Sequence, residues 1–272
     1  MITPPQSGSV PDRESSVTAD APGLLVVNAD DWGRYQETTD RTLDCVLRGA
    51  VSAASAMVFM EDSQRAAALA LEHGIDIGLH LNLTAPFSAQ VSSQLASHQQ
   101  KLASYLRWHR VAHVVFHPGL VESFKYVVTA QLEEFERLYG SPARRIDGHH
   151  HAHLCANVLL GNLLPEGVIA RRSFSFRRGE KSLGNRLYRK LVDHFLAKRH
   201  PVTDLFFSLP PLEPQRLQRI FSAARKFVVE LETHPVVPEE YRFLAGGEIF
   251  RWVGKEQIGP FRSRLAPFWS PR

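Results

Sequence analysis

The chain repeats one pattern along its length, a short apolar run followed by a segment with helical spacing. The run Leu24-Leu25-Val26-Val27 is apolar at every position, which is typical of a strand buried on both faces of a parallel sheet. No two runs are joined by a hairpin turn signal. The sequence therefore predicts an α/β fold, a distorted (β/α) barrel of about seven parallel strands. Strands are expected at 24–27, 51–59, 76–84, 144–147, 168–171, 205–208 and 227–235, with helices at 36–48, 62–73, 121–139, 156–164, 183–197 and 214–224.

Composition divides the chain into two predicted parts. Residues 1–22 are rich in Pro, Ser, Thr and acidic residues and have almost no apolar periodicity, so we expect a disordered N-terminal lead. Residues 23–272 are expected to form a single catalytic barrel domain, because 44% of the chain is hydrophobic and no boundary demands a second domain. Within that domain, the segment from 87 to about 119 has no clear periodicity, and no element is predicted there.

Location is predicted from what the sequence lacks. No stretch approaches the roughly 20 consecutive apolar residues of a transmembrane helix, and the start of the chain lacks the regions of a secretion signal. Cys45 and Cys155 form no C-x-x-C pair, so we expect reduced, buried thiols. These features predict a cytoplasmic protein.

The charge of the chain is unevenly distributed. The net charge is +4, yet ten Lys or Arg lie between Arg171 and Arg199 against two acidic residues. A nucleic-acid-binding protein would be more uniformly basic, so no nucleic-acid partner is expected. The basic segment is either a solvated face or a surface for an anionic substrate, a lipid headgroup or a partner.

Polar side chains recur at the carboxyl ends of the predicted strands. Asp30 and Asp31 follow the first strand, His80 lies near the end of the third, His149 follows the fourth, and His234 lies at the end of the seventh. Each alone could be structural, since adjacent aspartates cap helices and single histidines often lie hydrogen-bonded in a core. Because the strand ends of a (β/α) barrel share one rim, where active sites lie, we expect these five residues to meet there.

Four histidines and an aspartate are concentrated in residues 147–153. If Asp147 ends a strand, His149, His151 and His153 point to one face and His150 to the other. Convergent imidazoles with a carboxylate are typical of a catalytic metal site with open coordination positions. A solvated histidine-rich loop is the alternative.

Four motifs together resemble those of the YdjC-like carbohydrate deacetylases, which include chitooligosaccharide deacetylases and hopanoid-biosynthesis-associated deacetylases. They are Asn-Ala-Asp-Asp-Trp-Gly at 28–33, Gly-Leu-His-Leu-Asn-Leu-Thr at 78–84, Asp-Gly-His-His-His-Ala-His at 147–153 and Glu-Leu-Glu-Thr-His-Pro at 230–235. The resemblance covers about residues 24–236. It implies a deacetylase/glycoside hydrolase-like barrel that removes acetyl groups from N-acetylated amino sugars, their oligomers or conjugates.

The resemblance also implies roles for single residues. Asp31, His80 and His149 match the metal ligands for one divalent cation, Mg²⁺ or Zn²⁺. Asp30 matches the catalytic base, and His234 matches the histidine across the site. These roles suit amide hydrolysis, which needs an activated water, a stabilised oxyanion and a proton for the amine.

A second set of residues receives weaker predictions, which concern either the support of the metal ligands or contacts with the sugar. Asp147 is a candidate orienter of a ligating imidazole. Arg171 either contacts the sugar or forms a salt bridge at the rim. The other members, which line the site or border it, are His151, His153, Trp32 and Glu232; Trp32 and Glu232 depart from the family pattern.

Two other function classes remain open from the sequence. One is another metal-dependent hydrolase on the same barrel, a phosphoesterase or glycosidase, although the adjacent Asp30 and Asp31 do not obviously flank a glycosidic bond. The other is a non-catalytic sugar-binding protein. The sequence does not fix the oligomeric state, and a homodimer is compatible with it.

Overall fold

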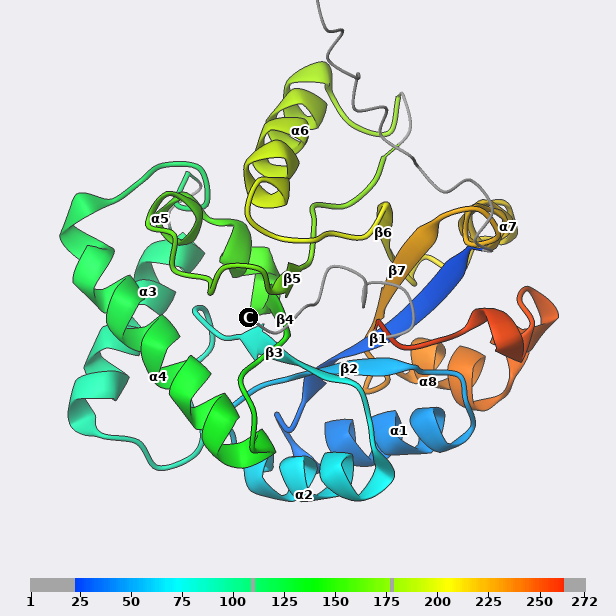
Figure 1. Cartoon of the computed structure of the whole chain (residues 1–272), viewed down its shortest axis with the longest axis horizontal. Helices are drawn as coiled ribbons and strands as arrows, with labels where there is room; N and C mark the ends of the chain where they lie inside the picture. Colours follow the sequence, from blue (N-terminus) through cyan, green and yellow to red (C-terminus); the bar gives the residue numbers. More distant parts are fainter. Residues whose placement is uncertain (1–22, 109–110, 177–178, 262–272) are drawn as a thin grey trace, which may run out of the picture.

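The fold is built on one curled sheet. The computed structural model describes residues 23–108, 111–176 and 179–261, so the predicted lead at 1–22 lies outside the described residues. Seven parallel strands follow the order β5-β4-β3-β2-β1-β7-β6 and form a trough (Figure 1). The predicted barrel-like α/β fold is therefore confirmed. The strands are β1 (Leu24–Trp32), β2 (Ala53–Ala56), β3 (Ile77–Leu81), β4 (Arg145–Gly148), β5 (Ile169–Ala170), β6 (Leu205–Ser208) and β7 (Val228–Thr233).

The two edges of the sheet approach each other without a full ladder between them. Strand β5 is only two residues long, and the chain that follows it runs beside β6. The backbone N–H of Ser175 donates to the carbonyl of Phe206 over 2.9 Å, and the N–H of Phe206 donates to Oγ of Ser175 over 3.1 Å. These bonds connect the segment after β5 to β6, so the sheet is partly closed between its two edge strands.

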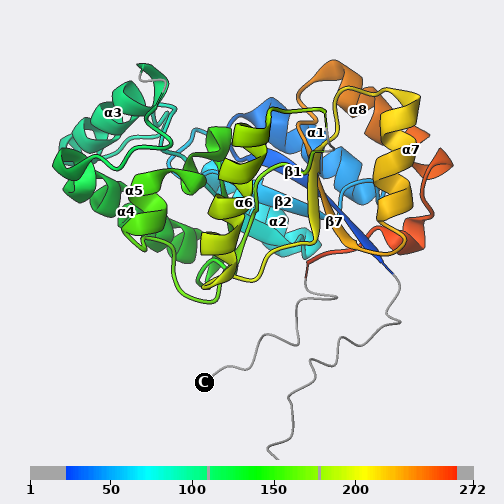
Figure 2. The ribbon, with the colours of Figure 1, turned by 90° about the horizontal axis from the view of Figure 1, so that it is seen from above.

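Helices cover the outside of the trough, with α1 and α2 beneath its convex side and α6 over the opposite side (Figures 1 and 2). Helix α3 is a finding that the sequence did not predict, although its buried Leu95, Gln99, Leu102 and Leu106 recur at helical spacing. Its many Ser and Gln residues interrupt the apolar pattern from which an amphipathic helix is predicted. The helices are α1 (Gln36–Leu47), α2 (Ser63–His73), α3 (Ser93–Trp108), α4 (Val121–Tyr139), α5 (Ala156–Leu160), α6 (Leu183–Ala197), α7 (Pro214–Ala223) and α8 (Pro238–Ala245).

The interior of the trough changes from apolar to charged along the strands. On β1, side chains alternate between the faces, so Val26, Asn28 and Asp30 line the inside in turn. Val26 packs with Phe261 in a small apolar cluster, whereas Asn28 bonds to Ser55 and Asp30. The inside of the trough is therefore apolar near the start of β1 and polar toward the carboxyl ends of the strands, where a site was predicted.

Two predictions from composition concern the whole chain. Cys45 and Cys155 are both buried and free, as expected. Within the described ranges, no helix has the length and apolar character needed to cross a bilayer.

Candidate active site

A bulge at the end of β1 brings two adjacent carboxylates to one place. Asp30 and Asp31 would point to opposite faces of a regular strand. The register against β2 shifts between Ala29 and Trp32, and Asp31 has a φ of 66°, so the alternation is broken. As a result Asp30 Oδ2 lies 3.9 Å from Nδ1 of His80, and Asp31 Oδ1 lies 3.5 Å from its Nε2.

The same bulge turns Trp32 into the core. Its side chain is fully buried, and the indole N–H donates to the carbonyl of Ala66 in α2 over 3.2 Å. The prediction that Trp32 lines a sugar site is therefore wrong, because the ring packs against a helix on the outside of the sheet.

His80 lies among three carboxylates and is oriented by one of them. Its Nδ1 is 2.7 Å from Oδ1 of Asp147, whose pKa stays far below the usual range: burial alone would raise it, but Arg171 and His80 outweigh burial. Burial alone would lower the pKa of His80, but Asp30, Asp147 and Asp31 raise it to about 9. Since an ionised carboxylate only accepts, Nδ1 carries a proton, and Nε2 faces Asp31; to bind a metal ion, Nε2 would give up the second proton that the raised pKa keeps on the ring. Asp147 therefore holds the ring of His80 in place, and its role in orienting a metal ligand stays a prediction.

The tautomer of His149 follows from its neighbours. Arg34 NH1 lies 3.2 Å from Nε2 of His149, and a guanidinium can only donate, so Nε2 is the bare nitrogen. The protonated Nδ1 then donates to Oγ1 of Thr84 over 2.9 Å. Burial, with the charge of His80, lowers the pKa of His149 to about 3, so the ring is neutral. The lone pair on Nε2 thus accepts from Arg34, and Oδ1 of Asp31 lies 4.0 Å from the same nitrogen; Arg34 would have to move for Nε2 to bind a metal ion.

The donor set of Asp31, His80 and His149 fits a metal ion. Oδ1 of Asp31 is buried and accepts no hydrogen bond, while both imidazole Nε2 atoms face it. Two tighter groups, with donors within 4.8 Å of one another, are Asp30–His80–Asp147 and Asp30–Glu232–His234. Both rely on Asp30, whose oxygens already accept bonds from Arg171 and Asn28. The unpartnered oxygen therefore favours Asp31 as the carboxylate ligand.

Arg171 is an internal cation rather than a sugar contact. It lies in the trough with 2% of its surface exposed, and it binds both oxygens of Asp30 over 2.6 and 2.7 Å. The same two nitrogens also reach Asp147 at 2.9 Å and Glu232 at 3.3 Å, and Nε reaches Glu230 at 2.7 Å. Of the two predicted alternatives, a contact with the sugar or a salt bridge, the structure shows the salt bridge, because four acidic side chains surround the guanidinium.

The opposite side of the site is formed by β7. Glu232, His234 and Asp30 place donor atoms within 4.8 Å of one another, so the structure places His234 beside Asp30. Glu232 also lies 3.7 Å from Nε2 of His151. Burial and the charge of Asp30 raise the pKa of Glu232 to about 8. Glu232 therefore holds a proton more readily than the neighbouring Asp30, whose pKa is lowered because Arg171 and His80 outweigh burial.

The alternation predicted for the histidine cluster is wrong. Residues His149–Leu154 form a 3₁₀ helix rather than a strand, and His150 and His151 both have a φ of 55°. His149 faces Asp31, His151 faces Glu232, and Nε2 of His153 bonds to the carbonyl of Arg171 over 2.9 Å. The turn therefore sends successive imidazoles to different partners, and His153 lies behind the site.

Four polar residues at the site received no role from the sequence. Arg34 bonds to Asp31, and Thr84 positions His149. Arg145 lies in the trough beside Asp147, where a Cβ at Gly78 would approach its Cζ to 2.7 Å. Thr84 and Glu230 lie inside the four motifs described above, so the sequence could have indicated that they belong to the site. Arg34 and Arg145 lie outside those motifs.

Comparison with known proteins identifies the family. The model of the YdjC-like protein family matches residues 24–252, most of the described chain. The chain belongs to the YdjC-like protein family. Asp31, His80 and His149, the Asp30–Arg171 pair and the β7 residues all lie inside the matched range.

Individual relatives of this YdjC-like protein agree with that result. A chitooligosaccharide deacetylase from Serratia marcescens is 32% identical over 132 residues, 48% of this chain and about half (51%) of that relative. A chitooligosaccharide deacetylase from Yersinia pestis (strain Pestoides F) is 28% identical over 234 residues, 82% of this chain and 85% of that one. A solved structure from Enterococcus faecalis V583, named for a proposed role in cellobiose-phosphate cleavage, has a TM-score of 0.61 at 17% identity and covers 88% of this chain and 97% of its own. This last likeness shows the fold.

Proposed function

We propose that this YdjC-like protein is a metal-dependent hydrolase that removes the acetyl group from N-acetylated amino sugars or their oligomers. The observation that carries the proposal is the buried, unpartnered Oδ1 of Asp31, faced by two imidazole nitrogens and adjoined by the separate carboxylate of Asp30. The names of the deacetylase relatives support the substrate class.

The proposed metal ligands are Asp31, His80 and His149. A divalent cation bound there would acidify a water and polarise the acetyl carbonyl. The cation is Zn²⁺ or Mg²⁺, and two imidazole ligands favour Zn²⁺, since Mg²⁺ prefers oxygen ligands. Asp147 and Thr84 would hold the two rings with their Nε2 atoms toward the cation.

The residues beside the metal ligands would move the protons. Asp30 is ionised and fixed by Arg171, so its carboxylate would accept a proton from the attacking water. His234 approaches from β7 with a third of its side chain exposed, and it would protonate the leaving amine. Glu232 has a carboxyl oxygen within 4.8 Å of donor atoms of both residues, and it would contact the sugar.

Acetate release tests this activity directly. Purified protein with Zn²⁺ or Mg²⁺ should release acetate from N-acetylglucosamine oligomers, because the site would combine a metal-bound water with a fixed base. A chelator should abolish the release, and returning the metal should restore it; acetate is measured by an enzyme-coupled assay. Release of phosphate from generic esters, or cleavage of the glycosidic link with the acetyl group retained, would favour another hydrolase. Sugar binding without any turnover would favour a non-catalytic role.

The Thr84 side chain offers a test of metal orientation. Thr84→Val keeps the shape of the buried side chain but removes the acceptor for Nδ1 of His149. We expect metal affinity to fall on the order of 10–100-fold with the fold intact. Isothermal titration with Zn²⁺ measures the change, and Thr39→Val, buried in α1 away from the site, is the control. Equal affinities for the two variants would contradict the role of Thr84.

Domain organisation, location and assembly stay predictions from the sequence. A single domain over 23–272, a cytoplasmic location and a homodimer are proposed, and limited proteolysis, cell fractionation and light scattering of the purified chain test them.

A further inference from the structure

Helix α6 presents two parallel rows of side chains to solvent. Leu183, Leu187, Leu191 and Phe195 recur every four residues, with 80, 70, 53 and 47% of their surfaces exposed. Three residues after each of these apolar side chains comes Arg186, Lys190, His194 or Lys198. Because positions three and four apart are neighbours on a helix, an apolar ridge about 18 Å long runs beside a basic row.

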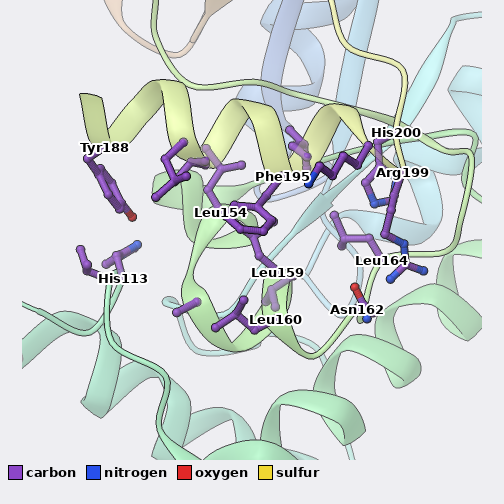
Figure 3. Close-up of a pocket in the computed structure, with 17 residues that line it drawn as sticks. His113, Leu154, Leu159, Leu160, Asn162, Leu164, Tyr188, Phe195, Arg199 and His200 are labelled. Carbon is purple, nitrogen blue, oxygen red and sulfur yellow. The ribbon is translucent and has the colours of Figure 1, made fainter. Parts of the chain in front are cut away.

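Little of this helix is used to hold the fold together. Only Val192 and Leu196 of its fifteen residues are buried, whereas α4 buries seven of nineteen. The apolar surface continues past the helix, because a pocket of about 260 Å³ between α6 and α5 is lined by Phe195, Leu160 and Val114 (Figure 3). Leu160 and Val114 are themselves 60 and 54% exposed. A continuous apolar surface of this kind usually marks an interaction site.

The charges around the ridge are nearly all of one sign. The two acidic residues of the segment are both engaged, Asp193 by Arg172 at 2.9 Å and Glu180 by Arg219. In the part of the chain that the structure describes, Arg186, Lys190, Lys198 and Arg199 form no ion pair with a carboxylate within 4.0 Å. The occupant of this face must therefore be anionic as well as apolar.

We propose that this α6 face, the ridge of Leu183, Leu187, Leu191 and Phe195 with its basic row, docks on an anionic lipid bilayer. A ridge of leucines beside a row of cations suits the boundary between acyl chains and phosphate headgroups. A second copy of this chain fits less well, because a symmetric contact would bring two basic rows together. A partner helix fits less well too, because helix-binding surfaces are grooves, whereas this ridge is a raised row on a helix and the adjoining pocket holds only about 260 Å³. The inference is independent of the proposed deacetylase activity.

Vesicle binding tests the proposal on the full chain. The protein should sediment with mixed phosphatidylglycerol–phosphatidylcholine vesicles, bind much less to phosphatidylcholine alone, and dissociate as salt is added. Lys190→Glu/Lys198→Glu should weaken binding at least roughly 30-fold, from about fivefold for each cation near an anionic surface. Leu183→Glu/Leu187→Glu should weaken it similarly by removing the inserted side chains.

Matched controls separate this face from general charge or apolarity. Lys101→Glu/Lys125→Glu makes the same charge change on α3 and α4, and Leu47→Glu/Leu71→Glu replaces leucines of similar exposure on α1 and α2. Both controls should bind vesicles like the unmodified chain, and circular dichroism should show all variants folded. Equal binding to neutral and anionic vesicles, or binding unchanged by the α6 variants, would overturn the proposal. So would a dimer that Leu183→Glu/Leu187→Glu dissociates while no form of the protein binds vesicles, which would assign the face to a second copy.

Discussion

Replacing Arg171 with Met should lower the free energy of unfolding by about 3–5 kcal/mol, the usual cost of removing one partner from a buried ion pair. The side chain is buried and contacts Asp30, Asp147, Glu230 and Glu232. Met fills similar space but leaves these carboxylates facing one another without their shared cation. Urea unfolding followed by circular dichroism measures the loss.

A surface pair provides the control for Arg171. Arg137 in α4 bonds to both carboxylate oxygens of Glu134 but is 58% exposed, so Arg137→Met should change stability little. Adding Glu230→Gln to Arg171→Met should recover part of the lost stability, because it removes one of the carboxylates left unpaired. Similar unfolding curves for Arg171→Met and Arg137→Met would show that the buried network does not depend on its cation.

The fold could be predicted because its signal is local. The buried strand at 24–27 and the helix at 121–139 are recognisable from hydrophobic pattern alone, and the polar residues after each strand follow from the parallel arrangement. Pattern failed at α3, where buried Gln99 pairs with the carbonyls of Asn82 and Ala85 instead of adding to an apolar stripe. A buried glutamine whose amide bonds to backbone carbonyls cannot be distinguished in the sequence from an exposed glutamine.

The site was harder to predict because its geometry depends on breaks in regular structure. The bulge at Asp31 and the left-handed His150 and His151 decide which way each side chain points, and neither is marked by a glycine. Arg171 shows a different limit. Whether it meets a sugar or carboxylates depends on residues 141 positions away, at Asp30, and 59 positions away, at Glu230. Sequence order alone does not contain that pairing.

The second large effect should separate the two adjacent aspartates. Asp30→Asn should lower acetate release on the order of 10²–10⁴-fold while metal binding is retained, because an amide still accepts a bond from Arg171 but takes no proton. Asp31→Asn should lose both activity and metal affinity, and the loss of affinity should exceed the roughly 10–100-fold typical of residues that only orient a ligand. Asp44→Asn, in a surface pair with Arg48, is the control for amide substitution.

Two measurements on each variant decide between the candidate metal centres. If Asp31→Asn loses Zn²⁺ in isothermal titration and Asp30→Asn keeps it, the cation is held on the side where Oδ1 of Asp31 has no hydrogen bond. If the pattern is reversed, the cation is held by one of the two groups that contain Asp30, either Asp30–His80–Asp147 or Asp30–Glu232–His234, in each of which the donors lie within 4.8 Å of one another. Arg171 would then have to release Asp30 on metal binding, and the stabilising effect of Arg171 would fall in the metal-bound protein. Urea unfolding of the Arg171→Met protein with and without Zn²⁺ would detect that change.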